Sequence, residues 1–433
     1  MNETGDGFAQ GGTPDLRYTP TFIVEHLVSI GQPNIAVSIA YRLGPWGFFN
    51  GVELANEGSL NLWLKYQRLA LHWVKENIAG FGDEPNKVVI YRQSASSESV
   101  GYQIRAYNGR DDGLFRGGMM EFGVVLPGSA LNLTWTYEPW LQQIADEAGC
   151  SQAIRKLDCL RRTLFTVFNN ILNTTANDIM PYNWRPTVDG GFVARYPSEQ
   201  LDTGDFVKVP IMIGYTTDEG PTVCPEPVNT TAELKEYLSS TTIYGWAFDE
   251  RVVSKLLELY PNNASLGPHG AAFRQTAAYY GDAQFIAATR YTYELWAAHN
   301  LTANCYRFNT KTDSYNWEEG VTHLSDVTFL FNNLNGYGFN PNPFVDASML
   351  QRAMLILVIS CPARGSASLI VWILMRRLGA GGTPIRRRIG RCMDLENSLC
   401  MIWNANVSSY AAPDTWRKEG IALINANRRA YQR

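Results

Sequence analysis

Short apolar runs rich in β-branched residues alternate with helix-like segments along most of the chain. The apolar runs cover residues 34–43, 87–91, 117–123, 209–215 and 304–308. Apolar positions recur at helical spacing between Leu62 and Ile78, and a second helix is expected from Val100 to Ala106. Buried strands that alternate with helices are typical of a mostly parallel sheet covered on both faces. The pattern therefore predicts one α/β domain.

Three stretches depart from this alternation. Residues 130–200 and 230–300 are rich in helical patterns and loops, so we expect helical insertions or a cap over the sheet. Residues 347–393 contain eight arginines but no Asp, Glu or Lys. One interpretation is a basic patch for an anionic partner. The other is a stretch read out of frame or through an intron, which the lack of lysine favours. We therefore expect residues 361–393 to be anomalous and to pack poorly.

Composition narrows the class of protein. The chain has 433 residues, of which 45% are hydrophobic and 18% charged, and this excludes a disordered chain, a coiled coil and a fibrous repeat. A net charge of −4 argues against a nucleic-acid binder.

The most apolar stretch, residues 353–375, is broken by Pro362, Arg364 and Gly365. Neither half reaches the roughly 18 residues of a membrane-spanning helix, so no membrane span is expected.

Cysteines and asparagines bear on the compartment. No CxxC pair occurs, and Cys150 and Cys159 are close enough in sequence for a disulfide to close a short loop. We expect Cys361, Cys392 and Cys400 not to pair, because two of them lie in the arginine-rich stretch. Asn-x-Ser/Thr sequons begin at Asn2, Asn132, Asn173, Asn229, Asn263, Asn300 and Asn406. They favour the secretory pathway, yet the first twelve residues contain no apolar region of a signal peptide. Either the protein is cytosolic or its beginning is absent.

The strand at 87–91 runs into Arg92-Gln93-Ser94-Ala95-Ser96 and then into a helix. A sharp strand–turn–helix joint that presents a serine is the device of serine hydrolases. The glycines of the G-x-S-x-G motif are not there, however. Taken alone, Ser94 is more typical of a helix N-cap.

Chain order suggests partners for Ser94, because the acid and then the histidine follow the serine in α/β-hydrolases. Three histidines come later in the chain: His269, His299 and His323. Of these, His323 follows a predicted strand, at the end where parallel sheets place their sites. Asp218 and Glu219 follow the preceding predicted strand. Either could supply the acid, or could merely cap the next turn.

Seven segments carry a resemblance to a known family. They are YRLGPWGF (41–48), GSLNLWLKYQRLALHWVKENIAGFG (58–82), KVVIYRQSASSESVG (87–101), DDGLFRGGMM (111–120), GYTTDEG (214–220), GVTHLSDVTFLFNN (320–333) and WNANVSSYAAPDTWR (403–417). In this order they resemble the type-B carboxylesterase/lipase family, which includes the cholinesterases, and most closely its secreted fungal branch. The resemblance implies a single α/β-hydrolase domain over residues 1–433, without a cofactor or a metal.

The resemblance also implies a role for each matching residue. Ser94 would be the nucleophile, Glu219 the triad acid and His323 the base. These residues would hydrolyse a small-molecule ester or a lipid through an acyl-enzyme, in a secreted protein.

The same resemblance implies two further features. The family's oxyanion loop aligns with Gly5-Asp6-Gly7-Phe8. Its donors would be the backbone N–H groups of Asp6, Gly7 and Ala95, which would stabilise the tetrahedral oxyanion. The resemblance further implies the disulfide Cys150–Cys159.

The chain departs from the family pattern at strained or crowded positions. Other residues replace the family's glycine at Asp6, Trp63, Asp83, Arg92 and Ser96. Tyr66 replaces an Asp, and Gln93 replaces a Glu. A Cβ at a strained turn costs about 1–3 kcal/mol, and Asp6 would bring a carboxylate to a site built for negative charge. The chain also begins inside the oxyanion loop, so it would lack the family strand that lies beside the strand carrying Ser94.

These observations leave two interpretations. The first is a secreted carboxylic ester hydrolase whose activity is impaired. The second is a catalytically silent binding protein, as among the cholinesterase-like adhesion proteins, or a decayed gene product. The complete set Ser94, Glu219 and His323 favours the first, because a binding protein has no need of all three.

Overall fold

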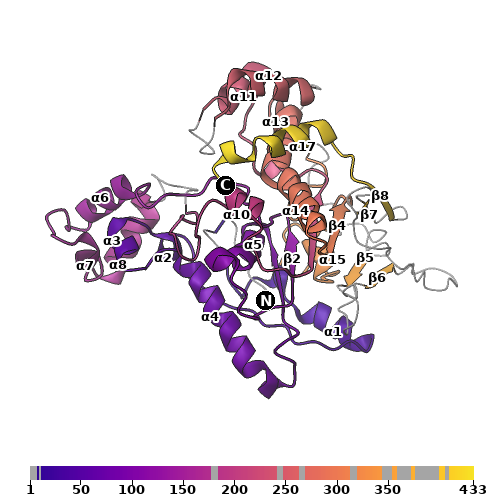
Figure 1. Cartoon of the computed structure of the whole chain (residues 1–433), viewed down its shortest axis with the longest axis horizontal. Coiled ribbons are helices and arrows are strands. Elements are labelled where there is room, and N and C mark those ends of the chain that lie inside the picture. Colours follow the sequence, from indigo (N-terminus) through magenta and orange to yellow (C-terminus); the bar gives the residue numbers. More distant parts are fainter. Residues whose placement is uncertain are drawn as a thin grey trace.

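The computed structural model is built around a six-stranded sheet (Figure 1). It describes residues 7–8, 11–176, 184–240, 247–262, 269–312, 319–343, 354–357, 372–375, 399–404 and 409–433. The sheet order is β1 (Val89–Gln93), β2 (Gly117–Glu121), β3 (Ile211–Thr216), β4 (Ala303–Phe308), β7 (Leu399–Trp403), β8 (Tyr410–Pro413). The first five strands are parallel and β8 is antiparallel to β7. The mostly parallel sheet and its helices form an α/β-hydrolase fold, as predicted.

Helices flank this sheet. The α-helices are α1 (Thr21–Ser29), α2 (Pro45–Phe48), α3 (Val52–Asn56), α4 (Leu62–Asn77), α5 (Ser94–Gly109), α6 (Glu138–Glu147), α7 (Lys156–Leu160), α8 (Phe165–Ile171), α10 (Pro197–Asp202), α11 (Thr231–Leu238), α12 (Glu250–Leu259), α13 (Phe273–Gly281), α14 (Ala287–Ala298), α15 (Val327–Leu330) and α17 (Lys418–Ala426). Shorter 3₁₀ or π turns are η1 (Leu16–Tyr18), η2 (Ile78–Phe81), η3 (Leu172–Ala176), η4 (Gly220–Thr222), η5 (Asp282–Ile286) and η6 (Arg428–Tyr431). The helix predicted from Leu62 is confirmed as α4.

Four of the five predicted strands are confirmed as β1 to β4. The prediction of a strand at 34–43 is wrong, because this segment has no regular structure and is largely exposed, with Ile35 40% exposed. A strand needs a neighbour to pair its backbone N–H and C=O groups. In the described part of the chain β1 pairs with β2 alone, and a cavity lies between β1 and residues 34–37, so the 34–43 segment is not within pairing distance of a strand.

Alternate residues of the strands face two separate apolar clusters. On one face Ile90 of β1 and Met120 of β2 pack with Leu71 of α4. On the other face Met119 of β2 belongs to a cluster that contains Leu330 of α15. The two-residue repeat of a strand sends neighbouring side chains to opposite faces, so both faces of β1 and β2 are covered.

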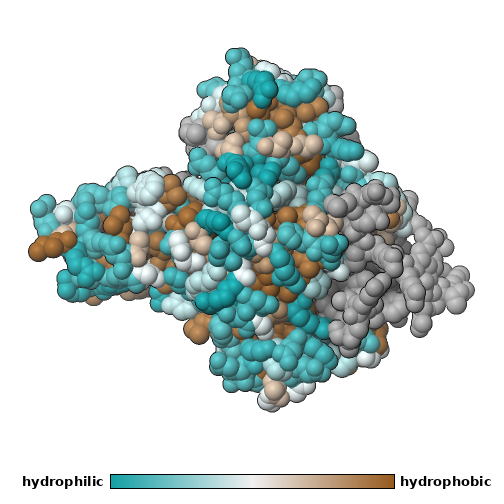
Figure 2. Space-filling view, in the orientation of Figure 1, coloured by the Kyte–Doolittle hydropathy of each residue, from teal (hydrophilic) through white to brown (hydrophobic). Residues whose placement is uncertain are grey.

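The regions predicted as insertions are helical. Helices α6, α7 and α8 form, with α3, the lobe at the left of Figure 1, and α11, α12 and α13 gather at the top. The face seen in Figure 2 is mainly hydrophilic, and apolar residues gather in separate patches, one of them at the end of the left lobe. Ile154 and Leu164, between α6 and α8, and Phe165, at the start of α8, are exposed apolar residues of this lobe.

Two disulfides occur among the described residues. Cys150 and Cys159 are bonded, with their Cα atoms 5.8 Å apart, as expected. The expectation that Cys400 would not pair is wrong, because Cys400 is bonded to Cys305. The two cysteines are directly opposite each other on the neighbouring strands β4 and β7. This register brings together cysteines that are 95 residues apart in sequence.

The arginine-rich stretch 361–393 lies outside the described residues except for β6 (Trp372–Met375), which pairs antiparallel with β5 (Met354–Leu357). The prediction of poor packing there stays a prediction, as do those for Cys361 and Cys392. Among the described residues, no helix is both long and apolar enough to cross a membrane.

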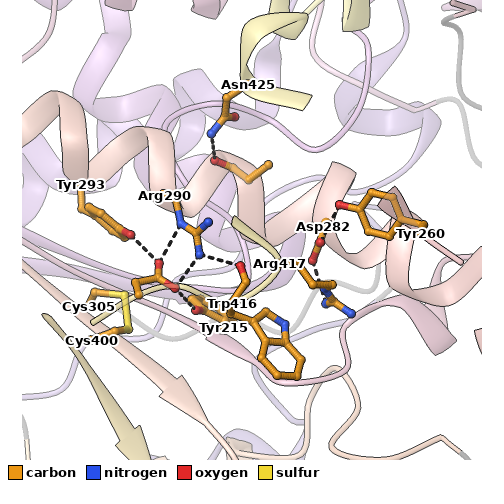
Figure 3. A network of polar contacts seen from close by, with 12 residues as sticks. Tyr215, Tyr260, Asp282, Arg290, Tyr293, Cys305, Cys400, Trp416, Arg417 and Asn425 are labelled. Carbon is orange, nitrogen blue, oxygen red and sulfur yellow. Dashed lines mark hydrogen bonds and ion pairs between the residues drawn. A yellow bond between two sulfur atoms is a disulfide. The ribbon is translucent and has the colours of Figure 1, made fainter. Parts of the chain in front are cut away.

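A buried carboxylate ties the segment after β8 to the sheet and to α14 (Figure 3). The Asp414 side chain is 1% exposed and accepts hydrogen bonds from Arg290 Nε at 2.9 Å and Nη2 at 2.5 Å. The hydroxyl groups of Tyr215, at 3.1 Å, and Tyr293 also donate to it. Burial, together with the nearby negative charge, raises the pKa of both tyrosines. Asp414 therefore joins strand β3 and helix α14 to the C-terminal region.

We expect Asp414→Asn to lower the free energy of unfolding by about 3–5 kcal/mol, because it leaves the buried Arg290 charge without its partner. Urea unfolding followed by circular dichroism measures the loss. Asp202→Asn is the control, since Asp202 pairs with Arg428 and Arg429 but is 21% exposed, and it should cost about 1 kcal/mol or less. Equal losses in the two variants would contradict the role given to Asp414.

Candidate active site

Ser94 stands at the joint between β1, which ends at Gln93, and α5, which begins at Ser94. Its φ is +56°, in the left-handed region that non-glycine residues seldom adopt. Backbone strain of this kind persists only where the surrounding structure imposes it, and it is frequent at functional sites. Gly123, after β2, leaves room for the Ser94 backbone, because a Cβ at position 123 would lie 2.5 Å from the Ser94 carbonyl oxygen.

The structure brings Ser94, His323 and Glu219 together. His323 Nε2 lies 2.7 Å from Ser94 Oγ, and His323 Nδ1 lies 2.6 Å from Glu219 Oε2. His323 is 6% exposed and Glu219 is fully buried. Ser94 directly follows β1, and Glu219 and His323 lie in the loops after β3 and β4, all at the carboxyl ends of parallel strands. These distances allow proton transfer along the row from serine to imidazole.

Both partners of the serine are held in place. The other oxygen of Glu219, Oε1, accepts a hydrogen bond from the Thr216 N–H group at 2.6 Å. The imidazole of His323 packs against two aromatic rings, and its centroid lies 5.2 Å from that of Phe122 and 4.7 Å from that of Phe285. The geometry therefore fixes both the carboxylate and the plane of the ring.

The alternative acid and bases have other contacts. Asp218 Oδ2 accepts from the Val321 N–H group at 3.0 Å, so this carboxylate holds the loop that carries His323 rather than the imidazole itself. Burial raises the pKa of Asp218. His269 Nδ1 lies 2.8 Å from Glu226, and His299 packs edge-on against Phe206.

The residues assigned to the oxyanion loop are only partly described. Asp6 lies outside the described residues. Gly7 has a φ of +59°, and the next residue, Phe8, has a carbonyl oxygen that accepts from the Gly44 N–H group at 2.9 Å. Ala95 is in the first turn of α5, directly after Ser94. The donor roles of Asp6, Gly7 and Ala95 stay a prediction.

Residues that depart from the family pattern are mostly buried. Arg92 is 4% exposed and Ser96 is fully buried, with its Oγ 3.1 Å from the Tyr41 hydroxyl. Trp63 is also fully buried and packs on the Phe8 and Phe48 rings, at centroid distances of 4.7 and 4.6 Å. A large ring therefore packs directly against the described part of the oxyanion loop.

Two buried carboxyl groups near the site were not anticipated from the sequence. Glu121, the last residue of β2, accepts from the Tyr91 hydroxyl at 3.0 Å, and Asp326 accepts from the Tyr306 hydroxyl at 3.3 Å. Both are fully buried. Burial, and then the charge of Asp326, raises the pKa of Glu121. Burial, and then the charge of Glu219, raises the pKa of Asp326. The position of Glu121 at a strand end is the one sequence signal that could have drawn attention to it.

Glu98, one turn after Ser94 in α5, should make stability depend on pH. Burial raises its pKa to about 7, while its Oε1 accepts from the Gly128 N–H group at 2.7 Å. The unfolded chain releases this proton at lower pH than the folded chain, so the folded state becomes less stable as pH rises from about 4.5 to about 7. The Glu98→Gln variant lacks this titration.

We expect the stability of Glu98→Gln, relative to the parent, to rise by about 3 kcal/mol between about pH 4.5 and pH 8. Urea unfolding midpoints at the two pH values measure the change. Glu258→Gln is the control, because the Glu258 side chain is 67% exposed and not buried. A difference for Glu98→Gln that does not vary with pH would contradict the assignment.

Comparison with known proteins places the chain in a family. The sequence pattern of the carboxylesterase family matches residues 4–358. The chain belongs to the carboxylesterase family. The match stops before the arginine-rich stretch 361–393.

Curated relatives of this carboxylesterase chain include fungal lipases. It is 32% identical to "Secreted lipase 1" of Botryotinia fuckeliana (strain B05.10), over 79% of this chain and 62% of the relative. It is 31% identical to "Lipase 4" of Diutina rugosa, over 75% of this chain and 61% of the relative. The chain thus spans about three fifths of the curated relatives it matches.

A solved structure of similar fold is Aspergillus niger EstA. The two structures superpose with a TM-score of 0.74, over 99% of this chain and 80% of the other, at 20% sequence identity. This likeness supports the α/β-hydrolase fold.

Proposed function

We propose that this carboxylesterase family member is a serine hydrolase of carboxylic esters that works through an acyl-enzyme, with impaired activity. The observation that carries the proposal is the row Ser94–His323–Glu219, with distances of 2.7 and 2.6 Å between successive side chains. The substrate class is a small-molecule ester or a lipid, in keeping with relatives named as lipases. Neither a nucleic acid nor a cofactor has a part in this reaction.

The reaction has two halves, acylation and deacylation of Ser94, and His323 and Glu219 act in both. His323 Nε2 takes the proton of Ser94 as Oγ attacks the ester carbonyl, and Glu219 accepts a hydrogen bond from Nδ1–H and stabilises the imidazolium. The imidazolium then protonates the leaving alcohol, and the C–O bond of the ester breaks to give acyl-Ser94. Water, deprotonated by His323, releases the acid and restores the serine. Backbone N–H groups at Asp6, Gly7 and Ala95 would stabilise the oxyanion in both steps.

The second candidate function is that of a catalytically silent binding protein, or of a decayed gene product. It is favoured by the burial of the long Arg92 side chain at the end of β1, next to the nucleophile position. A displacement of the nucleophile by about 1 Å can cost 10²-fold in rate. The Ser94 row is intact beside this residue, so the hydrolase interpretation remains the main proposal.

Export to an oxidising compartment belongs to the proposal. The chain has two disulfides, and disulfides persist best outside the cytosol. Some relatives are also named as secreted.

Expressed through a secretory pathway, the protein should carry N-glycans at Asn173, Asn229 and Asn300, which are exposed. It should carry none at Asn132, because that amide is 9% exposed and donates to the Tyr137 hydroxyl. Peptide mass spectrometry after glycosidase treatment reads out each site, and a glycan on Asn132 would contradict this fold.

The hydrolysis itself is tested with p-nitrophenyl butyrate at high enzyme concentration. We expect slow release of p-nitrophenol that Ser94→Ala abolishes and that Ser151→Ala, at an exposed surface position, leaves unchanged. Release that is equal in the parent and in Ser94→Ala would mean that Ser94 is not the nucleophile.

A further inference from the structure

Three carboxyl groups are buried at the carboxyl end of the sheet. Glu219 is the acid of the proposed triad, whereas Glu121, the last residue of β2, and Asp326, directly before α15, have no part in the proposed reaction. All three residues are fully buried. A buried charge is costly unless it is paired and hydrogen-bonded. We therefore do not expect the three groups to be ionised together.

The register of the sheet brings Glu121 towards Asp326. Glu121 of β2 is directly opposite Gly214 of β3, and Gly214 is directly opposite Tyr306 of β4. Residues in such a row face the same side of a parallel sheet. Gly214 has no side chain, and a Cβ there would lie 2.1 Å from the far end of the Tyr306 ring. The Tyr306 ring therefore extends across β3 towards Glu121, and its hydroxyl group donates to Asp326.

The hydrogen bonds of the three carboxyl groups differ. Both oxygens of Glu219 have a partner, Oε1 in the Thr216 N–H group and Oε2 in His323 Nδ1. Glu121 Oε2 and Asp326 Oδ2 each accept from a tyrosine hydroxyl. Their other oxygens, Glu121 Oε1 and Asp326 Oδ1, are buried without a partner among the described residues. Hydrogen bonds to a carboxylate stabilise its charged form, so the negative charge is favoured on Glu219.

The groups around Glu121 and Asp326 bring no positive charge. The titratable groups that surround this pair in the described part of the chain are tyrosines and the triad acid: Tyr18 of η1, Tyr91 of β1, Tyr306 of β4 and Glu219 after β3. Burial, and then the nearby negative charges, raises the pKa of Tyr91 and Tyr306, so both hydroxyl groups stay neutral. Burial likewise raises the pKa of Glu121 and Asp326. Neutral carboxyl groups are therefore the stable form of this pair.

We propose that Glu121 and Asp326 each hold a proton in the folded protein, so that the three buried carboxyl groups carry one negative charge, on Glu219. This inference rests on the proposed function, because it explains how Glu219 stays ionised as the triad acid. An ionised Asp326 would repel the charge of Glu219 and favour its protonation. A protonated Glu219 would stabilise the imidazolium of His323 less. Asp326 is therefore a positioning residue that acts through Glu219.

Infrared spectroscopy in D₂O detects these protons directly, because a protonated carboxyl group has a C=O stretch that a carboxylate lacks. We expect this band in the parent chain at about pH 8, where Glu98, with a pKa of about 7, is largely ionised. Asp326→Asn and Glu121→Gln should each remove part of it. The control is Glu258→Gln, at an exposed side chain, which should leave the band unchanged. If Asp326→Asn and Glu121→Gln also leave it unchanged, the two groups are ionised and the proposal is wrong.

The link between Asp326 and the triad is tested by Glu219→Gln, which removes the neighbouring charge. The band of Asp326 should then titrate at a pH lower by about one unit or more than in the parent chain. Asp326→Asn in the same background identifies the band. Both substitutions replace a carboxyl group by an amide of the same shape, and circular dichroism will verify that the variants fold. An unchanged titration would mean that Asp326 does not sense Glu219, and the positioning role would be wrong.

The effect on Ser94 is measured as the rate of its labelling by a fluorophosphonate probe. In Glu219→Gln the negative charge can move to Asp326, where it still stabilises the imidazolium. Asp326→Asn should therefore lower the labelling rate by a factor at least about tenfold larger in the Glu219→Gln background than in the parent chain. Equal factors in the two backgrounds would overturn the positioning role. A parent chain that the probe does not label would contradict the proposed function, whereas the infrared bands would still decide the charge of the three carboxyl groups.

Discussion

The chain should hydrolyse p-nitrophenyl butyrate at no more than about one thousandth of the rate of an intact relative such as Secreted lipase 1 of B. fuckeliana. Loss of one oxyanion donor alone typically costs about 10²–10³ in turnover. In the loop that the family resemblance assigns to the oxyanion, Asp6 replaces a glycine. A carboxylate about 4 Å from a developing oxyanion would oppose it by roughly 4 kcal/mol at an effective dielectric near 20.

Two further features would lower the rate by acting on the nucleophile itself. Arg92 is buried at the end of β1, two residues before Ser94, where the family has glycine. In the described structure β1 is also the edge of the sheet, next to an open cavity. Either feature can shift Ser94 Oγ by a fraction of an ångström, and about 1 Å costs roughly 10²-fold. Steady-state kinetics on both proteins, with the active-site concentration titrated, gives the ratio. The prediction of impaired activity would be wrong if the parent chain hydrolysed the ester at ordinary esterase rates and Ser94→Ala abolished this activity. The chain would then be an ordinary esterase.

The second large effect concerns repair. Asp6→Gly, Arg92→Gly and Ser96→Gly together should raise the activity of the present chain by less than about tenfold, because the open edge of β1 persists. A chimera should respond far more strongly. In it, the segment of Secreted lipase 1 that precedes its match to this chain is fused ahead of residue 1, in the same triple-glycine background. We expect it to regain about 10² or more in kcat/KM.

The contrast between the triple-glycine chain and the chimera carries this prediction. The chimera without the three glycines is the control, and it should recover only part of the rate because Asp6 and Arg92 remain. The triple-glycine chain without the fusion could instead reach the kcat/KM of the chimera. That result would show that the open edge of β1 does not limit activity.

Local patterns predicted much of the fold. The strands β1 to β4 and helix α4 appear within about two residues of their predicted positions, because buried β-branched runs and helical spacing are local signals. Residues 34–43 carry the same strand signal, yet they form no strand. An apolar run forms a strand only where a neighbouring strand pairs with it, and the local sequence does not predict whether such a neighbour is present.

The site was predicted unevenly for a similar reason. Chain order and strand ends pointed to Ser94 and His323, but only the family resemblance preferred Glu219 over Asp218. The structure places Glu219 at the imidazole and uses Asp218 to hold the loop. The bond between Cys305 and Cys400 was missed because it depends on the register of β4 and β7. The burial of Glu121 and Asp326 likewise depends on tertiary packing.

The central claim is that Ser94 is a nucleophile activated by His323. Treatment with a fluorophosphonate probe, followed by intact-protein and peptide mass spectrometry, tests it most directly, because the probe forms a stable bond only with an activated serine. We expect slow labelling with a single adduct on Ser94, lost in Ser94→Ala and strongly reduced in His323→Ala. No adduct in the parent chain, or an adduct on another residue that persists in Ser94→Ala, would contradict the claim.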